Sequence, residues 1–205
     1  MCSNDRETPA KLPSFRNLLI KLNSDLFEIS YKKPFAYWDS PALTELEILI
    51  LILEDRRFFS HHGVDLKSIA REAWRILSRQ KHGGASTIDM QLVRTLTGYK
   101  SPTIRRKVYE MILSVVIQFH YSKIEILRSY LHCAYLGHGL RGLDEAADHC
   151  YQARLDQLTF PQAAELAAML VYPCPRSQTP EWFSKVHRRA LYAAKLYPVL
   201  KRRIA

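Results

Sequence analysis

The sequence has few glycines and no clustered cysteines. Only 7 of its 205 residues are glycine, while 47% are hydrophobic, which favours a helical protein. Cys2, Cys133, Cys150 and Cys174 are widely spaced, with no CxxC pair and no histidine at zinc-ligand spacing. We therefore expect free thiols, no disulfide framework and no structural metal site.

Long apolar runs are also absent. The longest, Ile48 to Leu53, is far shorter than the ~20 residues that span a bilayer. The opening MCSNDRETPAKLPS lacks the apolar segment of a signal peptide. The sequence therefore predicts neither a transmembrane segment nor a signal peptide.

Acidic residues are in the minority. Twenty Asp and Glu against thirty Lys and Arg give a formal charge of +10, which favours anionic partners. Nucleic acid, an acidic membrane surface and a phosphorylated substrate all fit, and charge alone does not choose among them.

The length fits one domain with a short appendage. Residues 1–13 are polar and contain two prolines, so we expect disorder there, followed by an amphipathic helix over residues 14–29. We predict an N-terminal extension over residues 1–40 and the main domain over residues 41–205.

The segment EDRRFFSHHG, residues 54–63, follows an apolar helix. Thr44 and Glu47 fit a capping box at the start of that helix, which then brings Glu54 and Asp55 to its last turn. A carboxylate there opposes the helix dipole, at a cost of up to about 1 kcal/mol, which hints at function. The alternative is a purely structural helix end with its aromatic residues in the core.

The next predicted helix, residues 65–80, starts at the N-cap Asp65 and is strongly amphipathic. One face is apolar, and another carries Lys67, Arg71, Arg75 and Arg79. With Trp74, this pattern fits a helix lying on an anionic bilayer. An ordinary solvated cationic face remains the alternative.

Two later segments contain candidate polar sites. In GASTIDMQLVRTL, residues 84–96, Ser86 is a suitable N-cap with Asp89 as the third helical residue. Residues 101–119 predict a helix capped by Ser101, with Pro102 at its first position.

The apolar run over residues 111–119 covers all sides of that helix, so we predict that it forms the buried centre of the domain. Glu110 at the edge of the run needs cationic partners, which Arg106 and Lys107 can supply. A structural buried ion pair is the alternative. Further along, Ser122 and Glu125 fit another capping box, and helices are expected over residues 158–175 and 180–203.

Five segments, in order and spacing, resemble the motifs of peptidoglycan glycosyltransferases, family 51 of the glycosyltransferases and the transglycosylase half of bifunctional penicillin-binding proteins. The matching residues of the first three motifs are Glu54, Asp55, Phe58, His61 and Gly63; Gly84, Ser86, Thr87, Ile88, Gln91 and Leu92; and Arg106, Lys107 and Glu110. Those of the last two are Lys123, Ile126, Leu127, Tyr130 and Leu131; and Gly137, Gly139, Gly142, Ala146, Ala147 and Tyr151. Met90, Arg94, Thr95 and His132 depart from the family pattern, and Lys100 stands near the place of a missing arginine.

The resemblance implies an all-α, lysozyme-like fold and polymerisation of lipid II into a nascent glycan chain, with inversion and release of polyprenyl diphosphate. It implies Glu54 as the base and Glu110 as the second catalytic residue. The residues expected to contact substrate are Asp55, Phe58, His61, Ser86, Thr87, Gln91, Arg94, Arg106 and Lys107. A divalent cation such as Mg²⁺ or Mn²⁺ is compatible with diphosphate chemistry, and the sequence leaves the requirement open. The implied location is the outer face of the cytoplasmic membrane.

Two other functions compete with this interpretation. A lysozyme-like hydrolase would need a protonated acid rather than a base and a diphosphate site. A non-catalytic binder of lipid-linked glycan or membrane is favoured by the lost amide side chains at Met90 and Thr95. Nucleic-acid binding is supported by charge alone, so we predict no nucleic-acid partner.

Overall fold

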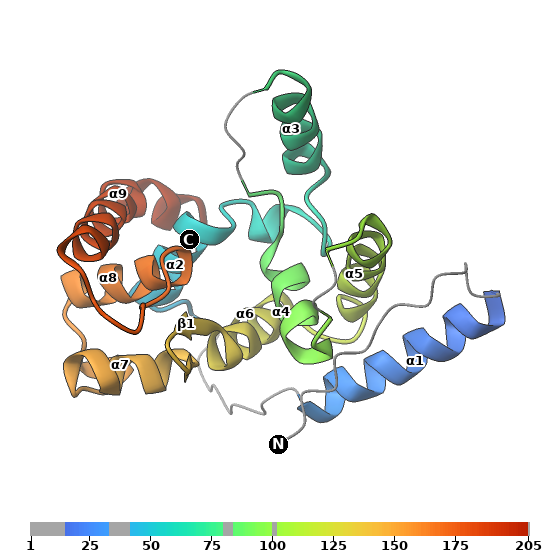
Figure 1. Cartoon of the computed structure of the whole chain (residues 1–205), viewed down its shortest axis with the longest axis horizontal. Helices are drawn as coiled ribbons and strands as arrows, with labels where there is room; N and C mark the ends of the chain where they lie inside the picture. The colour runs from blue at the N-terminus through green and yellow to red at the C-terminus, as the bar shows by residue number, and fades with distance from the viewer. Residues whose placement is uncertain (1–14, 33–41, 80–83, 100–101, 205) are drawn as a thin grey trace. The chain divides into compact units, whose positions relative to one another are not determined.

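Helices form almost all of the regular structure in the computed structural model of the chain, which describes residues 15–32, 42–79, 84–99 and 102–204 (Figure 1). This confirms the predicted all-α class. The helices are α1 Phe15–Lys32, α2 Glu45–Glu54, α3 Leu66–Leu77, α4 Ile88–Thr97, α5 Ile104–Ile117, α6 Lys123–Cys133, α7 Leu143–Tyr151, α8 Phe160–Val171 and α9 Pro180–Ile204. Short 3-10 turns lie at Phe58–Ser60 and Leu155–Gln157, and β1 Tyr135–Gly137 pairs antiparallel with β2 Leu140–Arg141.

The described residues divide into two compact units. Among the described residues, the first unit combines residues 15–32 with residues from 59 to 129, and the second combines residues 42–58 with residues 130–204. Each unit is described by itself below.

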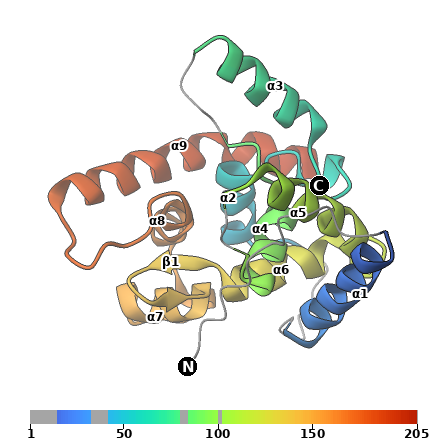
Figure 2. The same cartoon turned by 45° about the vertical axis from the view of Figure 1, so that its right-hand side comes forward.

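In the second unit α2 is the most buried helix. All residues from Leu46 to Leu53 are buried, because α8 and α9 pack against α2. Figure 2 shows the long helix α9 running past both α8 and α2. Small side chains on α8, such as Ala164 and Ala168, allow this close helix packing. The predicted capping box of Thr44 and Glu47 is present at the start of α2.

The small hairpin of the second unit depends on two glycines. A Cβ on Gly137, whose φ is +105°, would lie 2.1 Å from the carbonyl oxygen of Cys174. A Cβ on Gly142, whose φ is +82°, would lie 2.3 Å from the carbonyl oxygen of His132. Both positions exclude other residues, which accounts for two glycines of the fifth motif.

In the first unit α1 packs against α4 and α5, and α4 packs against α5 (Figure 1). The helix α3 differs, because none of its residues is buried. Its predicted N-cap, Asp65, is confirmed and accepts a hydrogen bond from the Lys67 backbone N–H at 3.1 Å. The predicted capping box of Ser122 and Glu125 is also present at the start of α6.

The prediction that residues 101–119 form the buried centre is wrong. Leu113 and Ile117 on α5 are buried, but Ile112 and Val115 face solvent and Phe119, just beyond the helix, is 82% exposed. Only one face of α5 packs against neighbouring helices, whereas α2 is buried on all sides. The apolar run therefore predicts α5 as the most buried helix, whereas α2 is more buried.

Two predicted helix starts are also wrong. Thr103, not Ser101, caps α5, which begins at Ile104, so Pro102 precedes the cap. Thr87, not Ser86, caps α4 and accepts a hydrogen bond from the Met90 backbone N–H at 3.3 Å. In both cases a neighbouring Thr has the extended backbone that an N-cap requires.

Some predictions lie outside the described residues. They concern the disorder of residues 1–13, Lys100 as a phosphate ligand and the thiol of Cys2. Cys133, Cys150 and Cys174 have free thiols, as predicted. No helix among the described residues has the length and apolar character to cross a bilayer.

Candidate active site

Glu54 is the last residue of α2 and is half-buried. The carbonyls of the preceding turn have cationic partners in the same unit. The Arg56 Nε donates to the Ile52 oxygen at 3.0 Å, and an Arg189 nitrogen donates to the Leu53 oxygen at 3.4 Å. These guanidinium groups offset the negative end of the helix dipole, which would otherwise disfavour a carboxylate at Glu54. Sequence reasoning missed Arg189, which lies on α9.

Asp55 is the C-cap of α2 and the first residue of the turn that follows. Its backbone N–H donates to the Leu51 oxygen at 3.0 Å, and its side chain accepts from the Arg57 backbone N–H at 3.3 Å. The Phe58 backbone N–H donates to the Asp55 oxygen at 3.1 Å, and the Phe58 side chain is fully buried. Asp55 and Phe58 thus shape the chain immediately after Glu54.

In the first unit two arginines, from the segments of the second and third motifs, converge on Glu110. The Arg94 Nε donates to Glu110 Oε1 at 3.0 Å and its Nη2 donates to Oε2 at 3.1 Å, a bidentate pair. Arg106, one helical turn before Glu110, also donates to Oε1. The carboxylate is completely buried, and the two guanidinium groups offset the cost of burying its charge.

Lys107 completes this cationic cluster, defined as Arg94, Arg106, Lys107 and Glu110. Its ammonium group donates to Ser86 Oγ at 2.7 Å. Burial, assisted by the positive charges of Arg94 and Arg106, lowers the pKa of Lys107 below its usual value, although Glu110 opposes the shift. The contributions of Arg94 and Arg106 to this shift reflect the positive charges that surround Lys107.

The cationic cluster has the properties of an anion site. Three cations share one carboxylate, so positive charge is in excess within the cluster. The buried Nε of Arg106 has no hydrogen-bond partner among the described residues. The Arg94 side chain is 38% exposed and is the member of the salt-bridged pair that reaches solvent. An incoming anion would therefore first meet Arg94.

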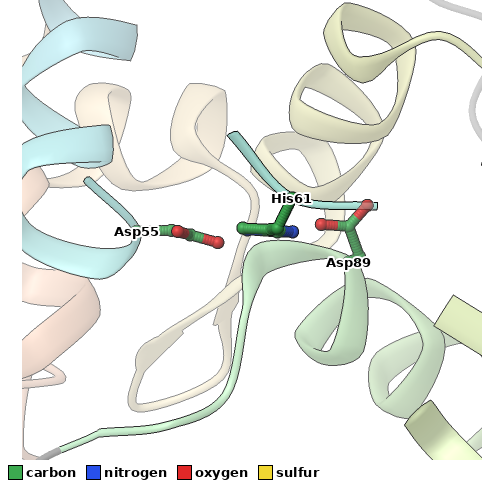
Figure 3. A group of neighbouring side chains, drawn as sticks. All are labelled: Asp55, His61 and Asp89. Atoms are coloured by element: carbon green, nitrogen blue, oxygen red, sulfur yellow. The ribbon is translucent and has the colours of Figure 1, made fainter. Parts of the chain in front are cut away.

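A second polar cluster of the first unit contains His61. Figure 3 shows its imidazole facing the carboxylate of Asp89, and both side chains are buried. The Lys123 ammonium lies 3.1 Å from Asp89 Oδ2 and 3.5 Å from His61 Nδ1, and Gln118 also donates to Asp89. Burial raises the pKa of Asp89, although Lys123 counteracts part of the shift.

The glycine of the first motif has a packing role. Gly63 has a φ of +80°, and a Cβ there would lie 2.2 Å from the Ser114 oxygen on α5. The Thr87 hydroxyl donates to the Gly63 oxygen at 2.6 Å. Thr87 and Gly63 thus join the loop after the first motif to the start of α4.

The predicted site residues fall into the two units. Ser86, Arg94, Arg106, Lys107 and Glu110 come together in the first unit, whereas Glu54, Asp55 and Phe58 belong to the second. Sequence reasoning predicted the pairing of Arg106 with Glu110 but missed the pairing with Arg94. Gln91 is half-buried on α4, where its backbone oxygen accepts from the Thr95 hydroxyl at 2.8 Å.

Comparison with known proteins places the chain in a family. Residues 35–196 match the family described as Transglycosylase. The chain belongs to this family. It is 37% identical over 120 residues to penicillin-binding protein 1F of Bacillus subtilis, covering 58% of this chain and 17% of the relative. A Cupriavidus necator protein with transglycosylase in its name is 39% identical over 125 residues, covering 61% of this chain and 54% of the relative. Penicillin-binding protein 1A of Rickettsia bellii is 34% identical over 130 residues, covering 62% and 16%.

The matched part therefore spans at most about half the length of these transglycosylase relatives. Each of the five motifs has a structural role in this chain, and that of the second is the Thr87 cap of α4. Gly63, Gly137 and Gly142 permit close backbone contacts, and the third motif forms the pair of Arg106 with Glu110. The fourth motif contributes Lys123, which pairs with Asp89.

The carboxylates of both clusters of the first unit have cationic partners. That of Glu110 receives Arg94 and Arg106, and that of Asp89 receives Lys123. The requirement for a divalent cation stays a prediction, and the chemistry proposed below uses side-chain cations.

Proposed function

We propose that this transglycosylase is a peptidoglycan glycosyltransferase that extends glycan chains from lipid II. The sugar 4-hydroxyl of the acceptor attacks the anomeric carbon of the donor chain, inverts it and expels polyprenyl diphosphate. The observation that carries the proposal is the cationic cluster around Glu110, because a departing diphosphate needs fixed positive charge.

Glu54 is the proposed general base of this reaction. A base that accepts the hydroxyl proton in the transition state contributes roughly 10²- to 10⁴-fold. Glu54 lies at the end of a buried, capped helix. This position supports the role, because the helix fixes the backbone of the residue that carries the carboxylate. The guanidinium groups of Arg56 and Arg189 at the carbonyls of the same helix end offset the helix dipole beside Glu54.

Arg94, Arg106 and Lys107 are the proposed ligands of the leaving diphosphate. Charge develops on this group as the glycosidic bond breaks, so cations already in position stabilise the transition state more than the ground state. Glu110 holds the two arginines in register from a fully buried position. Arg94 takes the place of the lysine in the family pattern, and its planar guanidinium has N–H donors beyond the two that bind Glu110.

The amphipathic helix α3 is the proposed contact with an anionic membrane surface. Leu66, Trp74 and Leu77 are 70%, 67% and 78% exposed. An ordinary surface helix would pack its apolar stripe against the protein, whereas α3 leaves that stripe open beside Lys67 and Arg71. Such a helix can insert its apolar face at the headgroup boundary while its cations meet anionic lipids. A membrane contact would bring the site to a lipid-linked substrate.

The test is polymerisation of labelled lipid II by the purified chain. Wild type should form glycan chains, and Glu54→Gln should fold normally but form none, because an amide cannot accept the proton. Arg94→Gln should also fail. Arg105→Gln removes the same charge from an exposed position on α5 and should keep activity. Binding of lipid II by wild type without chain growth would instead favour the non-catalytic binder.

A further inference from the structure

The helix α1 lies before residues 35–196, the range that matches the family, yet it carries a buried carboxylate. Asp25 is only 1% exposed where α1 packs against α4 and α5 (Figure 1). Burying a charged group is costly unless it is well paired, and an apolar residue would often give a more stable contact. The presence of Asp25 therefore calls for a role beyond general packing.

Two tyrosines bind the Asp25 carboxylate. The Tyr99 hydroxyl donates to Oδ2 at 2.9 Å and lies 3.1 Å from Oδ1, and the Tyr109 hydroxyl donates to Oδ2 at 2.6 Å. The two rings meet edge to face with their centroids 6.0 Å apart. The ammonium of Lys21, one turn earlier on α1, lies 4.5 and 4.6 Å from the two ring centroids. The two hydrogen bonds therefore hold the Asp25 carboxylate, and the cation–π contacts of Lys21 hold the two tyrosine rings.

Both tyrosines are close in sequence to residues of the cationic cluster. Tyr99 follows Gly98, the C-cap of α4, the helix that carries Arg94. Tyr109 immediately precedes Glu110 on α5. One carboxylate on α1 thus ties the end of α4 to the middle of α5. The bidentate contact of Arg94 with Glu110 joins the same two helices, and it requires their separation to be held closely.

We propose that Asp25 is a positioning residue, which holds α4 and α5 at the separation that brings Arg94 and Arg106 onto Glu110 and thereby sets the affinity of the cluster for a diphosphate. The identity of the anion rests on the proposed function. The helix α1 is then a working part of the site, although it lies outside the range that matches the family.

A second contact of α1 supports this arrangement. The Lys32 ammonium donates to the backbone oxygen of Leu96, in the last turn of α4, at 3.2 Å. A cation at a helix C-terminus is favourable. The helix α1 therefore holds α4 at two points, through Tyr99 and through Leu96.

The experiment measures binding of inorganic pyrophosphate to the full chain by calorimetry. Asp25→Asn replaces one of the two oxygens that the phenols contact by an amide nitrogen, which cannot accept, and should weaken binding by about tenfold, within the range of coupling between contacting residues. Asn23→Ala, at an exposed position on the same helix and outside the tyrosine contacts, should bind as wild type does. Asp25→Glu keeps the charge and should recover most of the affinity, which a general loss of packing would not predict.

Tyr109→Phe provides a milder variant should Asp25→Asn fold poorly, because it removes one hydrogen bond and keeps the buried ring. It should weaken pyrophosphate binding while circular dichroism stays unchanged. Wild-type affinity in Asp25→Asn or in folded Tyr109→Phe would overturn the inference. The proposed function is checked separately by Arg94→Gln. If that variant binds pyrophosphate normally, the cationic cluster is not the diphosphate site, whatever Asp25 does.

Discussion

At the scale of single residues, Glu110 organises the site of the first unit. Its buried carboxylate receives a bidentate arginine from α4 and a second arginine from its own helix. The sequence predicted the second contact, because residues four apart on a helix are neighbours. It could not predict the first, since nothing local indicates that α4 lies against α5. Arg189 at the end of α2 was missed for the same reason.

Replacing Glu110 should separate its structural and functional roles. Glu110→Ala leaves two guanidinium groups without their shared partner, and breaking a buried ion pair costs about 3 to 5 kcal/mol. Glu110→Gln keeps the shape and should cost less, yet it should still impair transfer. Chemical denaturation gives the free energies of unfolding. Glu28→Ala, which breaks a surface pair with Lys32, should cost at most about 1 kcal/mol. Equal losses in Glu110→Ala and Glu28→Ala would contradict this account of the cluster.

Lys107 should set an alkaline limit on anion binding. Its pKa is lowered below 10.5 by burial and by the charges of Arg94 and Arg106. Only the protonated form attracts an anion, so pyrophosphate affinity should begin to fall at a pH below 10.5 as Lys107 loses its proton. Lys107→Arg stays charged and should remove most of that decline. Calorimetry across the alkaline range measures the pyrophosphate affinity of wild type and of Lys107→Arg. If affinity declines equally in the two proteins, a group other than Lys107 is responsible.

At the scale of elements, the close contact of the Gly63 backbone with α5 positions the loop after the first motif. Gly63→Ala would place a methyl group 2.2 Å from the Ser114 oxygen at a φ of +80°. Strained φ costs roughly 1 to 2 kcal/mol and overpacking about 1 to 3, so the combined loss should exceed that of either alone. Gly98→Ala is the matched control, because Gly98 also has a positive φ but open space around it. Thermal unfolding should show the larger loss for Gly63→Ala, and a larger loss for Gly98→Ala would refute this packing role.

Vesicle binding tests the helix α3. Binding to anionic vesicles should be strong at low salt and weaken as ionic strength rises, with each cation near the surface contributing about 1 kcal/mol. Replacing Lys67, Arg71 and Arg75 together by Gln should weaken it. The same loss of charge on α9, at Lys185, Arg188 and Lys195, should have much less effect. Vesicle sedimentation measures the binding, and equal affinity for neutral and anionic vesicles would exclude α3 as an electrostatic anchor.

Element prediction succeeded where local chemistry decides and failed where packing decides. The capping boxes at Thr44 and Ser122 were found, because they depend on residues three apart. The apolar run over residues 111–119 predicts a buried helix, yet part of it is exposed. Hydrophobicity alone does not determine which helix is surrounded by the other helices. The role of α1 was invisible for the same reason, since Asp25 meets its tyrosines only in the folded chain.

At the scale of the whole molecule, the all-α class and the family could both be predicted from the sequence. The five motifs carried that prediction, because they place particular residues in a fixed order and at fixed spacings between Glu54 and Tyr151. How the chain acts on a substrate could not be predicted in the same way, because Met90, Thr95 and His132 remove amides that the family pattern contains. A synthase, a hydrolase and a non-catalytic binder make different demands on the same fold.

The most direct measurement compares two reactions of the same purified chain: growth of glycan chains from labelled lipid II, and release of soluble fragments from purified sacculi. If the cations around Glu110 stabilise a departing diphosphate, the chain should consume lipid II and leave sacculi intact, because finished glycan offers no such anion. Glu54→Gln should abolish the growth. Fragment release without chain growth would contradict the synthase account.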